Sequence, residues 1–157
     1  MVALVVNQAQ DGCAAVLRNT NYGLSPMRIA HAQYSFANDA GVQGLITPGF
    51  NFTIPANSVI YNVLLCSTTA VTSAGSATVS VGLTSPSAAA SLVAATAKAT
   101  WAAGAIVQGI PVPQTASSWI KVLGTPSQAT VTIATADLTA GIIEIYVHYI
   151  EVGTALT

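Results

Sequence analysis

Short apolar segments of strand length recur along this chain, separated by Gly, Pro, Ser, Asn and Thr, and helical periodicity is nearly absent. The stretch GSATVSVGLT, residues 75–84, places its side chains in two alternating rows, one apolar (Ala77, Val79, Val81 and Leu83) and one facing solvent (Ser76, Thr78, Ser80 and Gly82). A repeat of two residues is typical of a β-strand with one buried face. The recurrence of such segments predicts an antiparallel, all-β sandwich.

The expected strands cover roughly residues 32–37, 42–46, 50–54, 59–69, 76–83, 106–112, 118–123, 129–135 and 142–152. That number of strands suits two packed sheets in a single domain, which we assign to residues 31–157. Residues 88–99, AAASLVAATAKA, are rich in Ala and flanked by Pro86 and Gly104. For this stretch a short helix and an ordered loop fit the sequence equally well.

Two of the expected strands differ in what they face. In IIEIYVHYIE, residues 142–151, an apolar row (Ile143, Ile145, Val147 and Tyr149) lies opposite a mixed row (Glu144, Tyr146 and His148), which predicts one core face. In VIYNVLLC, residues 59–66, both rows are largely apolar, with Val59, Tyr61, Val63 and Leu65 on one of them. Such a strand needs a cover on each side. The second cover is either a loop of the same chain or a neighbouring subunit, and the low charge of the chain favours a subunit.

Charged residues make up only 6% of the 157 residues, whereas 52% are hydrophobic. An ordinary soluble domain carries roughly 25% charged residues. The net charge is -1 and the four basic residues are scattered, so we expect no nucleic acid as a partner. The apolar stretches are interrupted well before the ~20 residues that a spanning helix needs, so we expect no membrane as a partner. The composition is that of a surface made to be packed against other protein.

Residues 1–30 differ from the rest, because short apolar patches there mix with Asn, Gly, Ser and Pro. This segment is either an extended N-terminal arm lying on a partner or the first strand of the sandwich, and we favour the arm. Two cysteines, Cys13 and Cys66, are too few for a disulfide framework. They fit two free buried thiols better than one bridge.

Side chains that could support catalysis are few. His31 and His148 lie far apart in the sequence, and the carboxylates of Asp11, Asp39 and Asp137 stand in turn-like contexts, where they usually accept hydrogen bonds from backbone amides. No nucleophile elbow, phosphate loop or calcium-loop pattern is present. We therefore expect no enzyme, no catalytic residue, no metal and no cofactor.

The aromatic residues leave another possibility open. Trp101 and Trp119, with the five tyrosines, could line a platform that binds sugar. Aromatic side chains of a sandwich are more often found in its core or in an interface.

Two parts of the chain resemble small structural proteins of tailed phages. The first is FTIPANSVIYNVLLCSTTAVTSAGSATVSVGLTSPSAAASLVAATA, residues 52–97, with a Pro-Ala turn, a long strand, a Gly-Ser hairpin and an "SVG" strand. The second is ADLTAGIIEIYVHYIEV, residues 136–152, which is similar to the last hairpin of those proteins. The resemblance is to capsid decoration, or cement, proteins with a jelly-roll-like β-sandwich.

The resemblance implies a virion protein on the outer surface of an icosahedral capsid. Its partners would be further copies of itself, as a homotrimer, and the major capsid protein, whose neighbouring capsomers the trimer would bridge. The alternatives are a pilus or other surface-assembly subunit, and a virion module that binds carbohydrate or a receptor. Gly82 would let a neighbouring backbone approach closely, and the expected interface residues are Tyr61, Leu65, Gly82, Tyr146 and His148.

Overall fold

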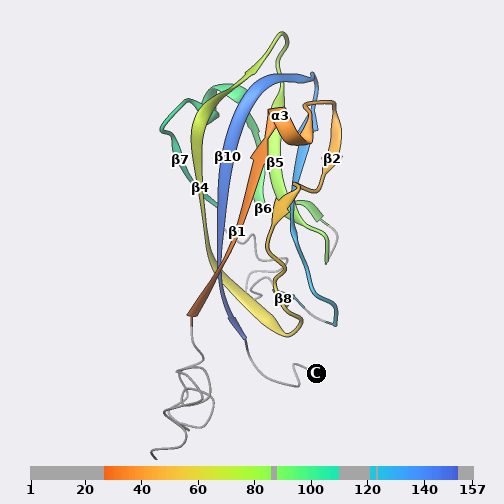
Figure 1. Cartoon of the computed structure of the whole chain (residues 1–157), viewed down its shortest axis with the longest axis vertical. Helices are drawn as coiled ribbons and strands as arrows, with labels where there is room; N and C mark the ends of the chain where they lie inside the picture. The colour runs from red at the N-terminus through yellow and green to blue at the C-terminus, as the bar shows by residue number, and fades with distance from the viewer. Residues whose placement is uncertain (1–26, 86–87, 110–120, 123, 152–157) are drawn as a thin grey trace, which may run out of the picture.

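The computed structural model describes residues 27–85, 88–109, 121–122 and 124–151. These residues form two antiparallel sheets that pack face to face (Figure 1). The prediction of an all-β sandwich is confirmed. The first strand begins at Met27, and residues 1–26, to which most of the expected arm belongs, lie outside the described residues.

Sheet A has the order β3-β1-β10-β4-β7, with β8 also paired to β4. Its strands are β1 (Met27–Ser35), β3 (Phe50–Asn51), β4 (Ser58–Ser73), β7 (Ile106–Gly109), β8 (Lys121–Val122) and β10 (Leu138–Glu151). Sheet B has the order β2-β9-β5-β6, made by β2 (Gly44–Ile46), β5 (Thr78–Leu83), β6 (Ala88–Ala97) and β9 (Ala129–Ala134). Two single turns complete the described elements, α3 (Phe36–Asp39) and the 3-10 helix η1 (Lys98–Trp101).

The strand pairing is nested. With the two-residue strands β3 and β8 set aside, the first strand pairs with the last (β1 with β10) and the second with the seventh (β2 with β9). The third pairs with the sixth (β4 with β7), and the fourth with the fifth (β5 with β6). A long hairpin of four and four strands, rolled up, produces this order, which is the jelly-roll topology.

The core lies between the inner rows of the two sheets. In β10 the alternation predicted from the sequence is confirmed, because Ile143, Ile145, Val147 and Tyr149 are all buried. From sheet B, the predicted inner row of β5 (Val79, Val81 and Leu83) faces them and is buried as well. Burial of each such side chain contributes about 1.5–3 kcal/mol.

Residues 88–97 form neither the helix nor the loop that the sequence suggested, but strand β6 at the edge of sheet B. β6 pairs with β5 in an irregular register, and Leu92 and Val93 are buried. The edge of β5 that is not paired with β9 needs a hydrogen-bonding partner, and the apolar side chains of Leu92 and Val93 must be buried. Both requirements outweigh the modest preference of Ala for a helix.

Strand β4 departs from a regular alternation at a β-bulge. His148 of β10 lies opposite Asn62, whereas the next residue, Tyr149, lies opposite Ile60, so Tyr61 is the extra residue. Ile60 therefore shares the inner side with Val63 and Leu65, all three being fully buried. In the sequence Tyr61 alternates on one row with Val63 and Leu65, and the bulge separates it from them.

The outward row predicted for β5 faces solvent at Ser76 and is half-buried at Thr78, but the prediction is wrong at Ser80 and Gly82. Ser80 and Gly82 of β5 lie opposite Thr132 and Thr130 of β9. Ser80 is 5% exposed, Thr130 is 0% exposed and Gly82 is also buried. We call Ser80, Thr130 and Thr132 the hydroxyl row. Its small side chains keep their alternation, but Ser80 and Thr130 are buried, and Thr132 is half-buried with its hydroxyl oxygen out of contact with water.

Candidate interaction surface

The outer face of sheet A presents the outward side chains of five neighbouring strands. Across the sheet, Gln33 of β1 lies opposite Glu144 of β10, and Glu144 lies opposite Cys66 of β4. Phe50 of β3 and Ile106 of β7 extend the same row at its two ends. A parallel row joins His31, Tyr146, Leu64 and Gln108. With strands about 4.8 Å apart, the face is roughly 20 Å wide.

Aromatic rings contact one another along this face. The rings of His31 and Tyr146 stack with their centroids 4.6 Å apart and an interplanar angle of 6°. Phe50 packs edge-on against His31 at 5.1 Å and against Phe52 at 5.6 Å. Such ring pairs contribute about 0.5–1.5 kcal/mol beyond the area they bury. The array is therefore held in place before any partner arrives.

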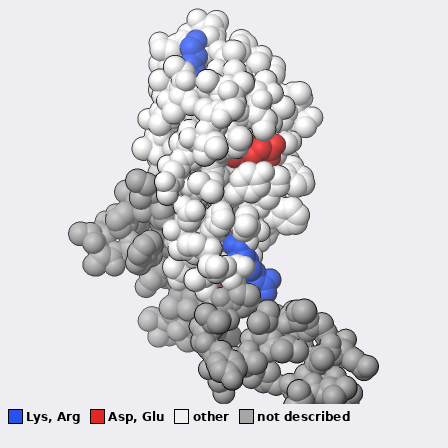
Figure 2. Space-filling view, turned by 90° about the vertical axis from the view of Figure 1, so that its left-hand side faces the viewer, with Lys and Arg blue, Asp and Glu red and all other residues white. Residues whose placement is uncertain are grey.

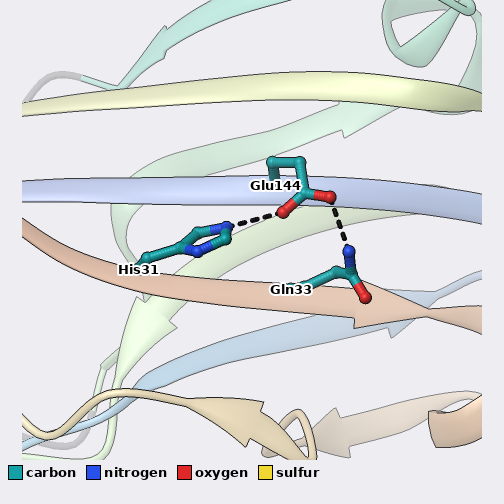
Figure 3. A network of polar contacts seen from close by, with 3 residues as sticks. All are labelled: His31, Gln33 and Glu144. Carbon is teal, nitrogen blue, oxygen red and sulfur yellow. Dashed lines mark hydrogen bonds and ion pairs between the residues drawn. The ribbon is translucent and has the colours of Figure 1, made fainter.

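One polar cluster lies within the face (Figure 3). The Glu144 carboxylate contacts His31 Nε2 through Oε2 at 2.6 Å and accepts a hydrogen bond from Gln33 Nε2 through Oε1, also at 2.6 Å. The Glu144 side chain is 13% exposed and that of His31 is 31% exposed. Because both carboxylate oxygens have partners from the neighbouring strand, a protein that covers this face need not bring a cation.

Five large apolar side chains remain exposed on the face or at its end, and we call them the face patch: Met27, Ile29, Phe50, Phe52 and Ile106. Two more are exposed at the far edge of sheet B, in and just before β2, and we call them the edge patch: Val42 and Leu45. Figure 2 shows one side of the molecule, where charged side chains are sparse and well separated. An exposed apolar set of this size is typical of a surface that binds another protein.

The predicted interface residues fall into two groups. Tyr61, Tyr146 and His148 lie on the outer face of sheet A, where the rings of Tyr61 and His148 are 5.9 Å apart. Leu65 is fully buried between the sheets and Gly82 is buried in β5. Neither is available to a partner, because Leu65 lies opposite the buried Ile145 on the inner side of sheet A and the outward side of β5 is covered at Gly82. Whether the first three contact a partner stays a prediction.

The sequence interpretation did not include His31, Gln33, Glu144, Phe50 or Ile106 in the surface. His31, Gln33 and Glu144 could have been identified only from the pairing of β1 with β10. In this register the outward side chains of the two strands lie next to each other on one face. His31 and Glu144 are 113 residues apart, so no local pattern joins them.

Asp39 and Asp137 accept hydrogen bonds from backbone amides, as predicted for aspartates in turn-like contexts. Asp39 accepts hydrogen bonds from Ser35 N at 2.9 Å and from Gly49 N at 2.8 Å. Asp137 accepts one from Gln43 N at 2.9 Å. Both acids thereby fix the chain on the two sides of β2. Asp11 lies outside the described residues.

Cys66 carries a free, half-buried thiol on the outer face of sheet A, and Cys13 lies outside the described residues. Trp101 is fully buried, so it cannot belong to an exposed sugar-binding platform, and Trp119 also lies outside the described residues. The described residues contain no group of three or more His, Cys, Asp and Glu side chains placed to hold a metal ion. Among the same residues, no helix is long and apolar enough to cross a membrane.

Comparisons with known proteins give matches in structure only. Neither a protein-family model nor a curated protein sequence matches the chain. A chain from the capsid of Ralstonia phage GP4 has a TM-score of 0.55 and 19% identity, covering 82% of this chain and 86% of that one. A chain from the acid-stable capsid of Helicobacter pylori bacteriophage KHP30 has a TM-score of 0.54 and 12% identity, covering 80% and 88%. At these identities the likeness shows a shared fold.

Proposed function

We propose that this protein is a non-enzymatic structural component of a phage virion. It decorates and cements the outer surface of an icosahedral capsid, as a homotrimer that bridges neighbouring capsomers. The observation that carries the proposal is the jelly roll that this chain shares, over about four fifths of its length, with chains from two phage capsids. The same fold serves many functions, so the surface must supply the rest of the argument.

The outer face of sheet A supports a role in assembly. Its apolar side chains are exposed, and its one internal carboxylate, on Glu144, already has two partners. Covering such a face removes apolar surface from water at about 25 cal/mol per Å² without leaving a charge unpaired. Three copies acting together would multiply this modest contribution through avidity.

The partners that suit this chemistry are proteins of low surface charge. We propose further copies of this chain and the major capsid protein as those partners, and neither nucleic acid nor membrane. The alternatives from the sequence receive no specific support. The free thiol of Cys66 does not favour a disulfide-bonded pilus subunit, and burial of Trp101 removes one of the two tryptophans from a carbohydrate-binding platform.

The direct test is binding to shells of the phage that encodes this protein, assembled without it. We expect the purified protein to have the native mass of a trimer and to sediment with the shells in a saturable manner. Bound protein should raise the temperature at which the shells dissociate. A folded protein that never sediments with any maturation state of the shell would overturn the proposal.

Deletion of residues 1–26 tests the arm separately, because it leaves every described strand in place. We expect the truncated protein to keep its thermal unfolding transition and to lose either trimer formation or shell binding. Truncated protein that forms trimers and binds shells as the full chain does would remove the arm from the proposed function.

A further inference from the structure

The exposed apolar side chains of the described residues gather in two separate places. The face patch lies on sheet A, and the edge patch, Val42 and Leu45, lies at β2, the outermost strand of sheet B. In Figure 1, β2 lies on the side of the molecule opposite β7, which carries Ile106; Phe50 of the face patch lies in β3, at the other edge of sheet A. The chain therefore has two unlike surfaces that each need a cover.

The charges near both patches already have partners within the chain. On sheet A, Glu144 binds His31 and Gln33, and at the end of the sheet Arg28 pairs with Glu151 at 3.1 Å. Beside the edge patch, the carboxylates of Asp39 and Asp137 accept hydrogen bonds from backbone amides. A strongly charged partner would find few unpaired charges to bind. A weakly charged partner with exposed apolar side chains fits both patches, and a second copy of this chain has that chemistry.

We propose that the face patch of one copy docks against the edge patch of a second copy, head to tail. A two-fold contact between two face patches would leave both edge patches in water. A head-to-tail contact joins two unlike surfaces, and when it closes into a ring it covers both patches of every copy. This contact rests on the proposed function only for the size of the ring, three copies.

The exposed apolar area of the face patch is of the right order for its side of such a contact, and the two side chains of the edge patch supply only part of the other side. Two half-exposed phenylalanines together with Met27, Ile29 and Ile106 present roughly 500 Å² of apolar surface. A stable interface buries about 800 Å² on each partner, of which somewhat more than half is apolar. The half-buried side chains between them, such as Tyr146 and Leu64, supply the remainder.

Two matched variants test the contact. Ile29 in the face patch and Leu45 in the edge patch are both 59% exposed, so aspartate at either position should leave the isolated fold intact. Ala94→Asp, at an exposed position of β6, is the control that carries the same charge change away from both patches. Native mass spectrometry reports assembly, and thermal unfolding verifies that each variant folds.

Cys66 provides a second, independent measurement, because its thiol lies on the outer face of sheet A. In a Cys13→Ser background it is the single thiol of the chain. We expect its reaction with a thiol reagent to be at least about tenfold slower in the assembled protein than in a monomer, since the docked copy excludes the reagent.

The expected result is that Ile29→Asp and Leu45→Asp are each monomeric with a fast-reacting Cys66, while Ala94→Asp remains assembled with a protected one. If Leu45→Asp stays assembled and protected, the copies meet face to face and the proposal is wrong. It is equally wrong if the parent protein is monomeric at about 100 μM. Shell binding is measured separately. If the protein forms the ring but does not bind shells, the head-to-tail contact stands and the proposed function is rejected.

Discussion

On the outer face of sheet A, Ile29 and Ile106 are 59% and 74% exposed, whereas on the outward side of sheet B Ser80 and Thr130 are almost or fully buried. These two apolar outward residues are thus in water, whereas the two polar ones are not. Both rows alternate with a core row as strands should, so the alternation identifies the two sides of each strand. It does not tell which outward side is covered.

The two rows are stabilised in different ways. On the outer face of sheet A, the Glu144 carboxylate is paired with His31 and Gln33. In the hydroxyl row of sheet B, the hydroxyl oxygens of Thr130 and Thr132 are buried without a hydrogen-bond partner. Small side chains limit the penalty of burying such groups, whereas a buried charge would be intolerable. Substitutions in the two rows should therefore have very different effects.

The largest expected difference comes from placing a lysine in each row. Ser80→Lys puts an unpaired charge at a 5% exposed position and should lower the free energy of unfolding by about 3 kcal/mol or more. Gln108→Lys, at an exposed position on sheet A, should change it by less than about 0.5 kcal/mol. Urea unfolding of both variants measures the contrast. Similar small losses would show that the outward side of β5 is open to water.

The next largest effect on the free energy of unfolding is expected at the polar cluster of sheet A. Glu144→Ala removes the partner of both His31 and Gln33 and should lower the free energy of unfolding by about 1–2 kcal/mol. Arg28→Ala breaks a more exposed ion pair with Glu151 and should lower it by no more than about 0.5 kcal/mol. Equal losses in the two variants would argue that the Glu144 cluster adds nothing beyond a surface ion pair.

The inner side of β1 gives a smaller effect with a pH signature. The Tyr34 hydroxyl donates a hydrogen bond to the Ala40 carbonyl at 2.8 Å, so Tyr34→Phe should lower the free energy of unfolding by about 1 kcal/mol. Burial, and then the nearby Asp39 charge, raise the pKa of Tyr34 from 10.0 to about 12. Burial also raises the pKa of Tyr149.

Because the folded state keeps the Tyr34 proton to higher pH than the unfolded chain, this stabilisation is complete below pH 10 and is lost as the pH rises towards 12. Melting temperatures measured from pH 9 to pH 12 should fall less steeply in Tyr34→Phe than in the parent. Parallel curves would contradict the assignment of this alkaline step to Tyr34.

The smallest expected effect has the opposite sign. Thr130→Val removes a buried hydroxyl that has no partner, so the free energy of unfolding should rise by up to about 1 kcal/mol. Thr139→Val is the control, because its exposed hydroxyl lies 2.8 Å from that of Thr72 and its loss should bring no gain. Destabilisation by Thr130→Val would mean that the hydroxyl has a partner in solution, such as a bound water.

How far the sequence predicts this fold depends on the strand. In β10 the apolar row is regular and was placed correctly, because a central strand with one core face needs that pattern. In β4 a single bulged residue, Tyr61, shifts the rows. The position of the bulge cannot be predicted from a strand that is largely apolar on both rows. In β6 the local preference of Ala for helix is overridden by pairing with β5, which is a tertiary effect.

The candidate surface was predictable only in part, for the same reason. Alternation alone put Tyr146 and His148 on the outward side of their strand. That they share a face with His31 and Phe50 depends on the registers of β1 with β10 and with β3. Those registers are set by the packing of the whole sandwich. The cover over Ser80 is likewise a property of the fold and not of the strand.

The place of β10 between β1 and β4 has a consequence for synthesis on the ribosome (Figure 1). Sheet A stays in two separate parts until Leu138–Glu151 has been made, and the pairing of Met27 with Ile150 joins almost the whole described length of the chain. Folding that depends on such distant contacts is slow, and it cannot finish before Leu138–Glu151 has been made. A chain that stops before Leu138 has every other strand and no means of joining the two parts of sheet A.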